Sequence, residues 1–221
     1  MARGAQLVLL LSVLSCWCGA TAAARPTPSD AASAPAGAGA GFVRSWCAGT
    51  EYPALCDATL APYAGAVGAS PARVAWAALT VALGGARNAT AAMRGMAAAG
   101  QMAPVAAEAA QDCVSMLGSA VGMLRQSADA MARIGEDEEQ KKEEGGGGGG
   151  SSSRDVRFRV DSVQTWASAA LTDADMCMEG FRGEAAGGGG ARESVRGHVA
   201  GVAHLAANAL CIVNAMAKQM P

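Results

Sequence analysis

The side chains whose chemistry the sequence predicts most directly are five cysteines that follow the first 24 residues. They are Cys47, Cys56, Cys113, Cys177 and Cys211. In an oxidising compartment five thiols can form two disulfides and leave one over, in several possible arrangements. Cys47 and Cys56 lie close together in sequence around Tyr52-Pro53, so a short turn can bring their sulfur atoms into bonding distance.

Other residues that could support catalysis or metal binding are poorly placed for it. His198 and His204 are six residues apart in one helical stretch, so they point in different directions around its axis. Acidic pairs such as Asp173 and Asp175 have the pattern of a solvated helix surface. The cysteines and histidines lack the CxxC or HxxxH spacing of a zinc site. We therefore expect a binding protein that is not an enzyme, with no catalytic residue, metal or cofactor.

Residues 1–24 have the features of a secretory signal peptide. Arg3 precedes an apolar core at residues 7–14, and three alanines at residues 22–24 form a small-residue cleavage site. That core is too short to span a bilayer, and no later stretch reaches about 18 uninterrupted apolar residues. We expect a secreted protein without a membrane anchor. In such a protein the sequon Asn88-Ala89-Thr90 makes Asn88 a candidate glycosylation site.

The overall composition argues against two classes of partner and favours one fold class. Seventeen Lys and Arg residues against nineteen Asp and Glu residues, with a net charge of −2, lack the basic surface that nucleic acid binding requires. The same balance disfavours binding a polyanionic polysaccharide by charge. Hydrophobic residues make up 51% of the chain, and many are alanine, the strongest helix former. The composition therefore favours an all-α domain.

Composition also divides the chain into segments. Residues 25–41 are mostly Ala, Pro, Gly and Ser, so we expect a disordered leader before a domain at residues 42–217. The domain begins with a helical hairpin over residues 42–63, which Pro53 and Pro62 interrupt. Residues 136–153 contain a charged run, six glycines and three serines, and we expect them to form a flexible loop inside the domain.

Four long amphipathic helices are predicted after the hairpin. Ser70-Pro71 starts a helix that ends near Gly100, and Pro104 starts a second that ends at Gly135. Buried positions in the last three helices recur at steps of three and four residues. These positions are Cys113, Leu117, Ala120, Leu124, Ala128 and Met131; Val156, Val160, Val163, Ala167, Ala170, Ala174, Cys177 and Phe181; and Val195, Val199, Val202, Ala206, Ala209, Val213 and Met216. The pattern predicts an up-down-up-down antiparallel four-helix bundle with an N-terminal helical hairpin extension.

Four blocks of the chain resemble the plant invertase and pectin methylesterase inhibitor family. FVRSWCAGTEYPALCDATLAPYA, residues 42–64, resembles the family's N-terminal hairpin, and Asp112-Cys113 with Ala120-Val121 resembles its second bundle helix. TWASAALTDADMCMEGF, residues 165–181, resembles the third helix, and LAANALCIVNAM, residues 205–216, resembles the fourth. The resemblance implies a four-helix bundle with disulfides Cys47–Cys56 and Cys113–Cys177, which leaves the Cys211 thiol over.

The resemblance also implies a function. It predicts a secreted inhibitor in the plant apoplast and cell wall, which binds pectin methylesterase as a monomer in a 1:1 complex and occludes the substrate cleft. Contacts would come from the second and third bundle helices. The candidate contact residues are Asp112, Ser115, Ser119, Thr172, Asp173, Met176 and Glu179. Two alternatives stay open: an inhibitor of acid invertase on the same scaffold, and a wall interaction protein without inhibitory activity.

Several positions depart from the family pattern. Invertase inhibitors typically have Pro-Lys-Phe near the start of the third helix, whereas this chain has Val156-Arg157-Phe158, which favours pectin methylesterase as the target. Ser115 and Ser119 stand where the family often has Glu and Asp. Met176 replaces a usual Thr, and Glu179 replaces a common Asp. Losing interfacial carboxylates predicts an inhibitor that is weaker, shifted in target or altered in its response to pH.

Overall fold

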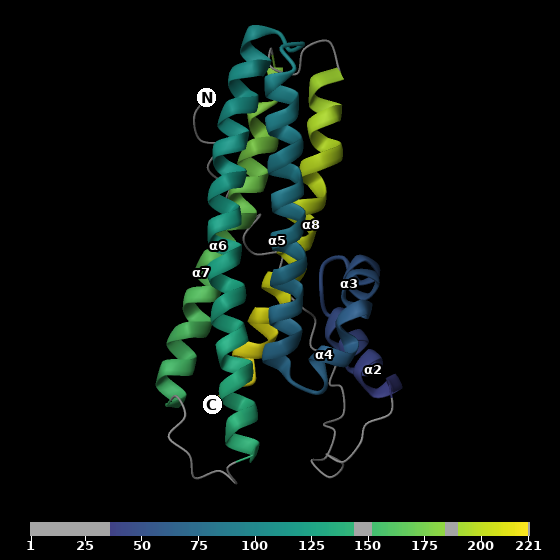
Figure 1. Cartoon of the computed structure of the whole chain (residues 1–221), viewed down its shortest axis with the longest axis vertical. Coiled ribbons are helices and arrows are strands. Elements are labelled where there is room, and N and C mark those ends of the chain that lie inside the picture. The colour runs from purple at the N-terminus through teal and green to yellow at the C-terminus, as the bar shows by residue number, and fades with distance from the viewer. Residues whose placement is uncertain (1–35, 144–151, 184–189, 221) are drawn as a thin grey trace, which may run out of the picture.

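A computed structural model describes residues 36–143, 152–183 and 190–220. The predicted signal peptide at residues 1–24 lies outside the described residues. Four long helices, α5 (Pro71–Ala98), α6 (Pro104–Glu143), α7 (Ser153–Gly180) and α8 (Gly190–Lys218), run alternately up and down. Both α6 and α8 pack against α5 on one side and α7 on the other, which closes the bundle (Figure 1). The predicted all-α, up-down-up-down antiparallel bundle is confirmed.

Local sequence signals set where two of the helices begin. The side chain of Ser70 caps α5 by accepting a hydrogen bond from the Arg73 amide, and Pro71 occupies the first helical turn. Ser152 caps α7 in a capping box: the Asp155 amide donates to Ser152 Oγ at 3.1 Å, and the Ser152 amide donates to the Asp155 carboxylate. These bonds satisfy amides that have no partner within the helix, so hydrogen bonds between neighbouring residues mark the starts of α5 and α7.

The core is the inner face of the four helices, and most of its side chains are small. The residues predicted at steps of three and four are all buried, apart from the half-buried Val156. Larger side chains fill the remaining space, and Leu79, Met93, Leu124 and Phe181 are fully buried. The alanines bury little area each, but they let helix backbones approach closely, so packing extends along the whole bundle.

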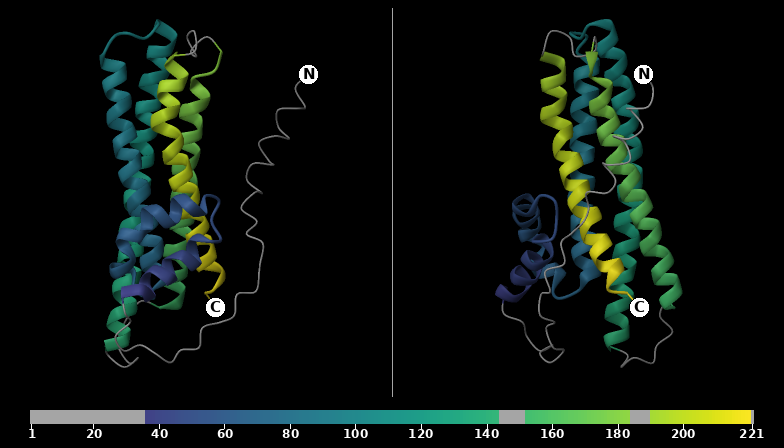
Figure 2. Two further views of the ribbon diagram at one scale, coloured as in Figure 1. Left: turned by 90° about the vertical axis from the view of Figure 1, so that its right-hand side faces the viewer. Right: turned by 180° about the vertical axis from the view of Figure 1, so that it is seen from behind.

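The N-terminal hairpin packs across one side of the bundle. It consists of α2 (Ala36–Cys47), α3 (Pro53–Leu60), a short 3₁₀ turn η1 (Ala61–Tyr63) and α4 (Ala64–Val67). Figure 2 shows these elements against the lower half of α5 and α8, and both α3 and α4 contact α5. The disulfide Cys47–Cys56 joins α2 to α3, with 5.4 Å between the Cα atoms. The hairpin is therefore closed covalently and fixed to the bundle by packing.

The start of the hairpin differs from the prediction. Residues 36–41 were assigned to a disordered leader, but they form the first turns of α2. Gly39 accounts for the difference, because a Cβ atom at that position would lie 2.3 Å from the carbonyl oxygen of Ala64. The absence of a side chain lets α2 pack directly on α4. That contact is between residues far apart in the sequence, so local composition could not predict it.

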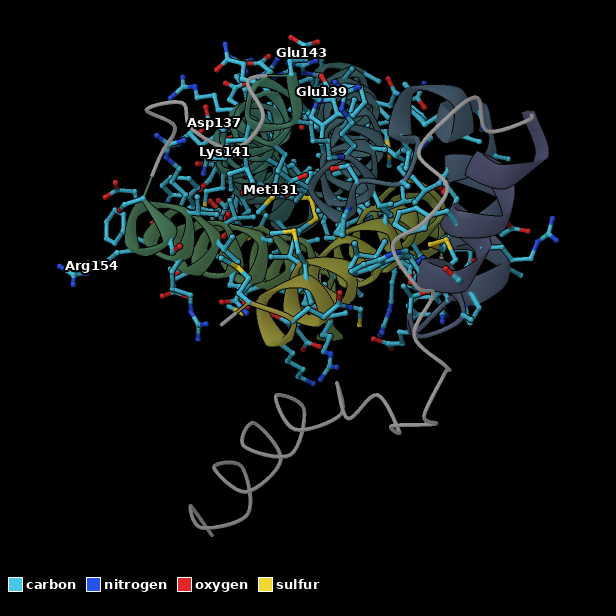
Figure 3. All side chains as sticks on the ribbon, turned by 90° about the horizontal axis from the view of Figure 1, so that it is seen from below. Met131, Asp137, Glu139, Lys141, Glu143 and Arg154 are labelled. Atoms are coloured by element: carbon cyan, nitrogen blue, oxygen red, sulfur yellow. A yellow bond between two sulfur atoms is a disulfide. The ribbon has the colours of Figure 1, made fainter. Side chains whose placement is uncertain are left out.

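The end of α6 also differs from the prediction. Gly135 does not end the helix, which continues to Glu143, so the predicted flexible loop at residues 136–153 is wrong for residues 136–143 and for the start of α7. Three carboxylates of this extension have partners on other elements: Glu138 accepts from Ser70 Oγ at 2.7 Å, Glu139 pairs with Arg73, and Asp137 pairs with Arg159 at 3.3 Å. Figure 3 looks onto this end of the bundle, with Asp137, Glu139, Lys141 and Glu143 around the end of α6. These partners offset the cost of a glycine within a helix, which is about 1 kcal/mol.

The last helix, α8, contains a long apolar stretch. Within the described part of the chain, α8 is the helix with the length and hydropathy to cross a membrane. More than half of its most apolar window is buried inside the bundle, where it packs on α5 and α7. Burial in the core of the bundle accounts for this hydropathy.

Candidate functional site

Two contacts fix how α6 and α7 lie against each other. At one end the disulfide Cys113–Cys177 joins the helices, with 4.5 Å between the Cα atoms. At the other end Asp137 of α6 forms an ion pair with Arg159 of α7. From the first contact to the second, the residue number rises from 113 to 137 in α6 and falls from 177 to 159 in α7, so the two helices are antiparallel. The two contacts together fix which residues of α6 lie beside which residues of α7.

The α6 candidates form one exposed stripe. Asp112, Ser115 and Ser119 follow each other at steps of three and four residues, and all three are exposed. Ser119 lies 18 residues before Asp137 (137 minus 119), which is five helical turns, so it shares the side of α6 that meets α7. Cys113 and Leu117 lie buried behind the stripe. These three side chains therefore present polar groups beside the bridged end of the α6/α7 pair.

The α7 candidates form a second stripe beside the first. Thr172, Met176 and Glu179 are exposed, again at steps of four and three residues. Met176 directly precedes Cys177, as Asp112 directly precedes Cys113, so the two stripes flank the same disulfide. We name the six exposed residues of the two stripes the bridge face. It combines hydroxyls, two carboxylates and one large apolar side chain, Met176, which is 50% exposed.

Asp173 differs from the other six candidates. The residue is half-buried, and its Oδ2 atom is buried without a hydrogen bond from any residue that the structure describes. An unpaired buried acceptor costs about 1–3 kcal/mol, which a donor from a binding partner could recover. Asp173 therefore lies at the margin of the bridge face, and its exposure differs from what the sequence pattern predicts.

The structure also contains a cluster that the sequence did not reveal. Asn208 of α8 holds the backbone of Tyr52, whose ring stacks on His204 with 4.1 Å between ring centroids. Burial raises the pKa of the Tyr52 phenol, and a hydrogen bond with Glu51 raises it further. Desolvation also raises the pKa of Asp175 on α7, as do the negative charges of Glu179 and Glu51, while His204 lowers it. The tip of the hairpin thus lies beside both α7 and α8.

The two histidines lie in different surroundings. The His204 ring stacks on the Tyr52 ring, and His198 is exposed. The Asp155 carboxylate accepts hydrogen bonds from Ser152, which hold its pKa below the ordinary value. No group of three metal-binding side chains occurs in residues 36–143, 152–183 or 190–220.

Another large apolar side chain is exposed on the same helix. Phe158, near the start of α7, is 73% exposed. It lies 18 residues before Met176 (176 minus 158), so the two side chains point to the same side of α7. A signal for this was present in the sequence, because Phe158 falls outside the buried stripe through Val156, Val160 and Val163.

Comparison with known proteins identifies the family. Residues 41–212 match the family model described as plant invertase/pectin methylesterase inhibitor. The chain belongs to this family. Membership makes it an inhibitor-family protein rather than an enzyme, in agreement with the expectation from the sequence.

Individual members of the inhibitor family match most of the chain. Pectinesterase inhibitor 9 of Arabidopsis thaliana is 33% identical over 183 residues, which cover 80% of this chain and 81% of the relative. A carrot (Daucus carota) protein named 21 kDa protein is 31% identical over 173 residues, covering 78% and 82% respectively. A crystal structure of a mutant form of a pectin methylesterase inhibitor from Arabidopsis matches with a TM-score of 0.55 at 20% identity, covering 79% of this chain and 94% of that one. This structural match supports the fold.

Proposed function

We propose that this chain is a secreted inhibitor of plant pectin methylesterase, which binds the enzyme one to one through the bridge face and occludes its substrate cleft. The observation that carries the proposal is the bridge face itself: two exposed stripes held in register by Cys113–Cys177 on an inhibitor-family scaffold. The name of the Arabidopsis relative supports the choice of pectin methylesterase over invertase. A standard interface of about 1,600 Å² would cover the face and part of the adjoining helix surface.

Several features of the chain support secretion as part of the proposal. Both disulfides would persist in an oxidising compartment such as the apoplast. Asn88 is exposed on α5, which lies outside the α6/α7 pair, so a glycan there would leave the bridge face accessible. The hydroxyl of Thr90 donates to the carbonyl of Ala86 within the helix, so the sequon would have to be modified before α5 folds. Mass spectrometry of protein secreted from plant cells tests both cleavage after Ala24 and glycosylation at Asn88.

The central experiment is a parallel titration of the oxidised protein against a pectin methylesterase and an acid invertase, at pH 5 and pH 7. We expect loss of methylesterase activity alone, with an equivalence point near one to one. Loss of invertase activity alone would overturn the choice of target. If neither enzyme is inhibited while circular dichroism shows an intact helical fold, the result favours the alternative of a wall interaction protein without inhibitory activity.

Variants of the bridge face test the location of the interface. Thr172→Arg places a long charged side chain in the α7 stripe, one helical turn from Met176, and we expect it to raise the concentration for half inhibition by about tenfold or more. Arg94→Ala is the matched control, since Arg94 is exposed on α5. If both variants inhibit as well as the wild type, the interface lies elsewhere on the molecule.

A further inference from the structure

Met176 is more exposed than the other methionines that the structure describes. Together with Val105 and Phe158 it is one of the large apolar side chains that lie exposed among the described residues. Met93 and Met131 are fully buried, and Met216 is 6% exposed. The thioether of Met176 is therefore the methionine sulfur on α7 that a small solute can reach most easily.

The two residues that follow Met176, Cys177 and Met178, also contain sulfur and are less exposed than Met176. Cys177 is 1% exposed and already oxidised in its disulfide with Cys113. Met178, two residues further along α7, is half-buried and packs against the core. An oxidant approaching the bridge face thus meets the Met176 sulfur first.

The position of Met176 would make its oxidation consequential. It lies between Thr172 and Glu179 in the α7 stripe and is the large apolar side chain of the bridge face. Methionine is enriched in protein interfaces, where its flexible, polarisable side chain is desolvated on binding. Making this side chain polar would add a desolvation cost to complex formation.

We propose that Met176 is a site of oxidation by hydroperoxides, and that its sulfoxide weakens binding of the target enzyme; the second part rests on the proposed function. The co-reactant is hydrogen peroxide or an organic hydroperoxide. A sulfur lone pair attacks the hydroxyl oxygen of the peroxide, and the O–O bond breaks as the S–O bond forms. The proton of that hydroxyl passes to the departing oxygen, which leaves as water or an alcohol. Sulfur loses two electrons and the peroxide gains them, so the product is methionine sulfoxide, a polar and chiral group.

The first test measures which methionines react. The disulfide-intact protein is treated with graded hydrogen peroxide and digested, and the sulfoxide fraction of each methionine is followed by mass spectrometry. We expect Met176 to react at least about tenfold faster than Met93 or Met131, because susceptibility follows exposure. Equal rates for these three residues would overturn the assignment of the site.

The second test measures the effect on binding. Inhibition of a pectin methylesterase is titrated before and after peroxide treatment for the wild type, Met176→Leu and Met178→Leu, each compared with its own untreated sample. We expect oxidation to raise the concentration for half inhibition by about fivefold or more in the wild type and in Met178→Leu, and by less than twofold in Met176→Leu. Equal losses in Met176→Leu and the wild type would overturn the proposed effect.

A third variant reproduces the product without an oxidant. Met176→Gln has a side chain of similar length with a polar end, and we expect untreated Met176→Gln to bind as weakly as the oxidised wild type. If the untreated wild type itself fails to inhibit the enzyme, the proposed function is overturned, and with it the effect on binding. The oxidation rates would still decide whether Met176 is the reactive site, so the two failures are distinguishable.

Discussion

Asn208 and Tyr52, 156 residues apart in sequence, form two hydrogen bonds between one side chain and one backbone. The Tyr52 amide donates to Asn208 Oδ1 at 2.9 Å, and Asn208 Nδ2 donates to the Tyr52 carbonyl at 3.0 Å. Asn208 is 3% exposed, so in the folded chain its polar atoms bond to Tyr52 where water has little access. This pair fastens the tip of the N-terminal hairpin to α8.

Replacing Asn208 by alanine is expected to lower the free energy of unfolding by about 2–4 kcal/mol, because the Tyr52 amide loses its acceptor and the Tyr52 carbonyl keeps only the Cys56 amide as a donor. Asn214→Ala is the matched control. Asn214 is half-buried on the same helix and accepts one side-chain hydrogen bond, from Gln164, so its loss is expected to cost about 1 kcal/mol. Urea denaturation measures both, and equal costs would contradict the role assigned to the Tyr52 pair.

The two disulfides are expected to differ in how much they stabilise the fold. Cys113 and Cys177 close a segment with a separation of 64 residues, whereas Cys47 and Cys56 are separated by 9. Loop-closure entropy predicts a loss of about 4 kcal/mol on replacing the first pair by alanine and about 2.5 kcal/mol for the second. Denaturant unfolding of the two double variants gives the comparison. A larger loss from the hairpin pair would show that native packing outweighs the entropy of the unfolded chain.

Ser70 has a double role that its removal should reveal. Its hydroxyl caps α5 and also donates to Glu138 of the α6 extension. Ser70→Ala is expected to destabilise the protein by about 1–2 kcal/mol, since it removes the cap and leaves Glu138 without this donor. Ser153→Ala, in the exposed first turn of α7, is the control and should change stability by less than about 0.5 kcal/mol. Thermal unfolding of both variants, monitored by circular dichroism, measures the difference between Ser70→Ala and Ser153→Ala.

The raised pKa of Asp175 predicts a pH dependence of stability with a definite sign. Since the folded chain holds this proton more tightly than the unfolded chain, the contribution of Asp175 is present at low pH and is lost as the pH rises above about 4. Asp175→Asn should therefore lose less stability than the wild type between pH 4 and pH 7, as measured by urea unfolding.

Asp155 provides a control of opposite sign for the Asp175 prediction. Its pKa is lowered by hydrogen bonds from Ser152, so its contribution is present above about pH 4 and is lost as the pH falls. Asp155→Asn should consequently be less stable than the wild type at pH 7 and approach it at low pH. The same direction of change in both variants would contradict the two assignments.

The serines of the α6 stripe offer a test by gain of affinity. Ser115→Glu combined with Ser119→Asp places two carboxylates where the family resemblance expects them, and both positions are exposed. If the bridge face meets polar groups of pectin methylesterase, this double variant should inhibit at a concentration about tenfold lower than the wild type. Gln126→Glu, exposed further along α6, adds a charge outside the bridge face and controls for net charge. Unchanged inhibition by the double variant would count against the bridge face as the interface.

Much of the fold and part of the site could be predicted because they depend on nearby residues. Ser70-Pro71 and Pro104 mark helix starts by local hydrogen bonding and by proline geometry, and periodic burial identifies the inner faces of α6, α7 and α8. The same periodicity places Ser115, Thr172 and Met176 on exposed faces. Burial along these helices repeats at steps of three and four residues, so a single sequence is enough to predict which faces are buried.

Tertiary structure decided the features that depend on distant partners. Gly135 weakens a helix locally, yet α6 continues because Ser70, Arg73 and Arg159 meet its carboxylates. The backbone of Tyr52 has a partner in Asn208 only when the hairpin packs on α8, and Asp173 is half-buried rather than exposed. The sequence by itself determined the helices and their inner faces, since capping hydrogen bonds and the spacing of apolar residues both involve residues that are close together in the chain. The end of α6, the hydrogen bonds between Asn208 and Tyr52, and the half-burial of Asp173 required the fold. Their energies come from contacts between residues far apart in the chain.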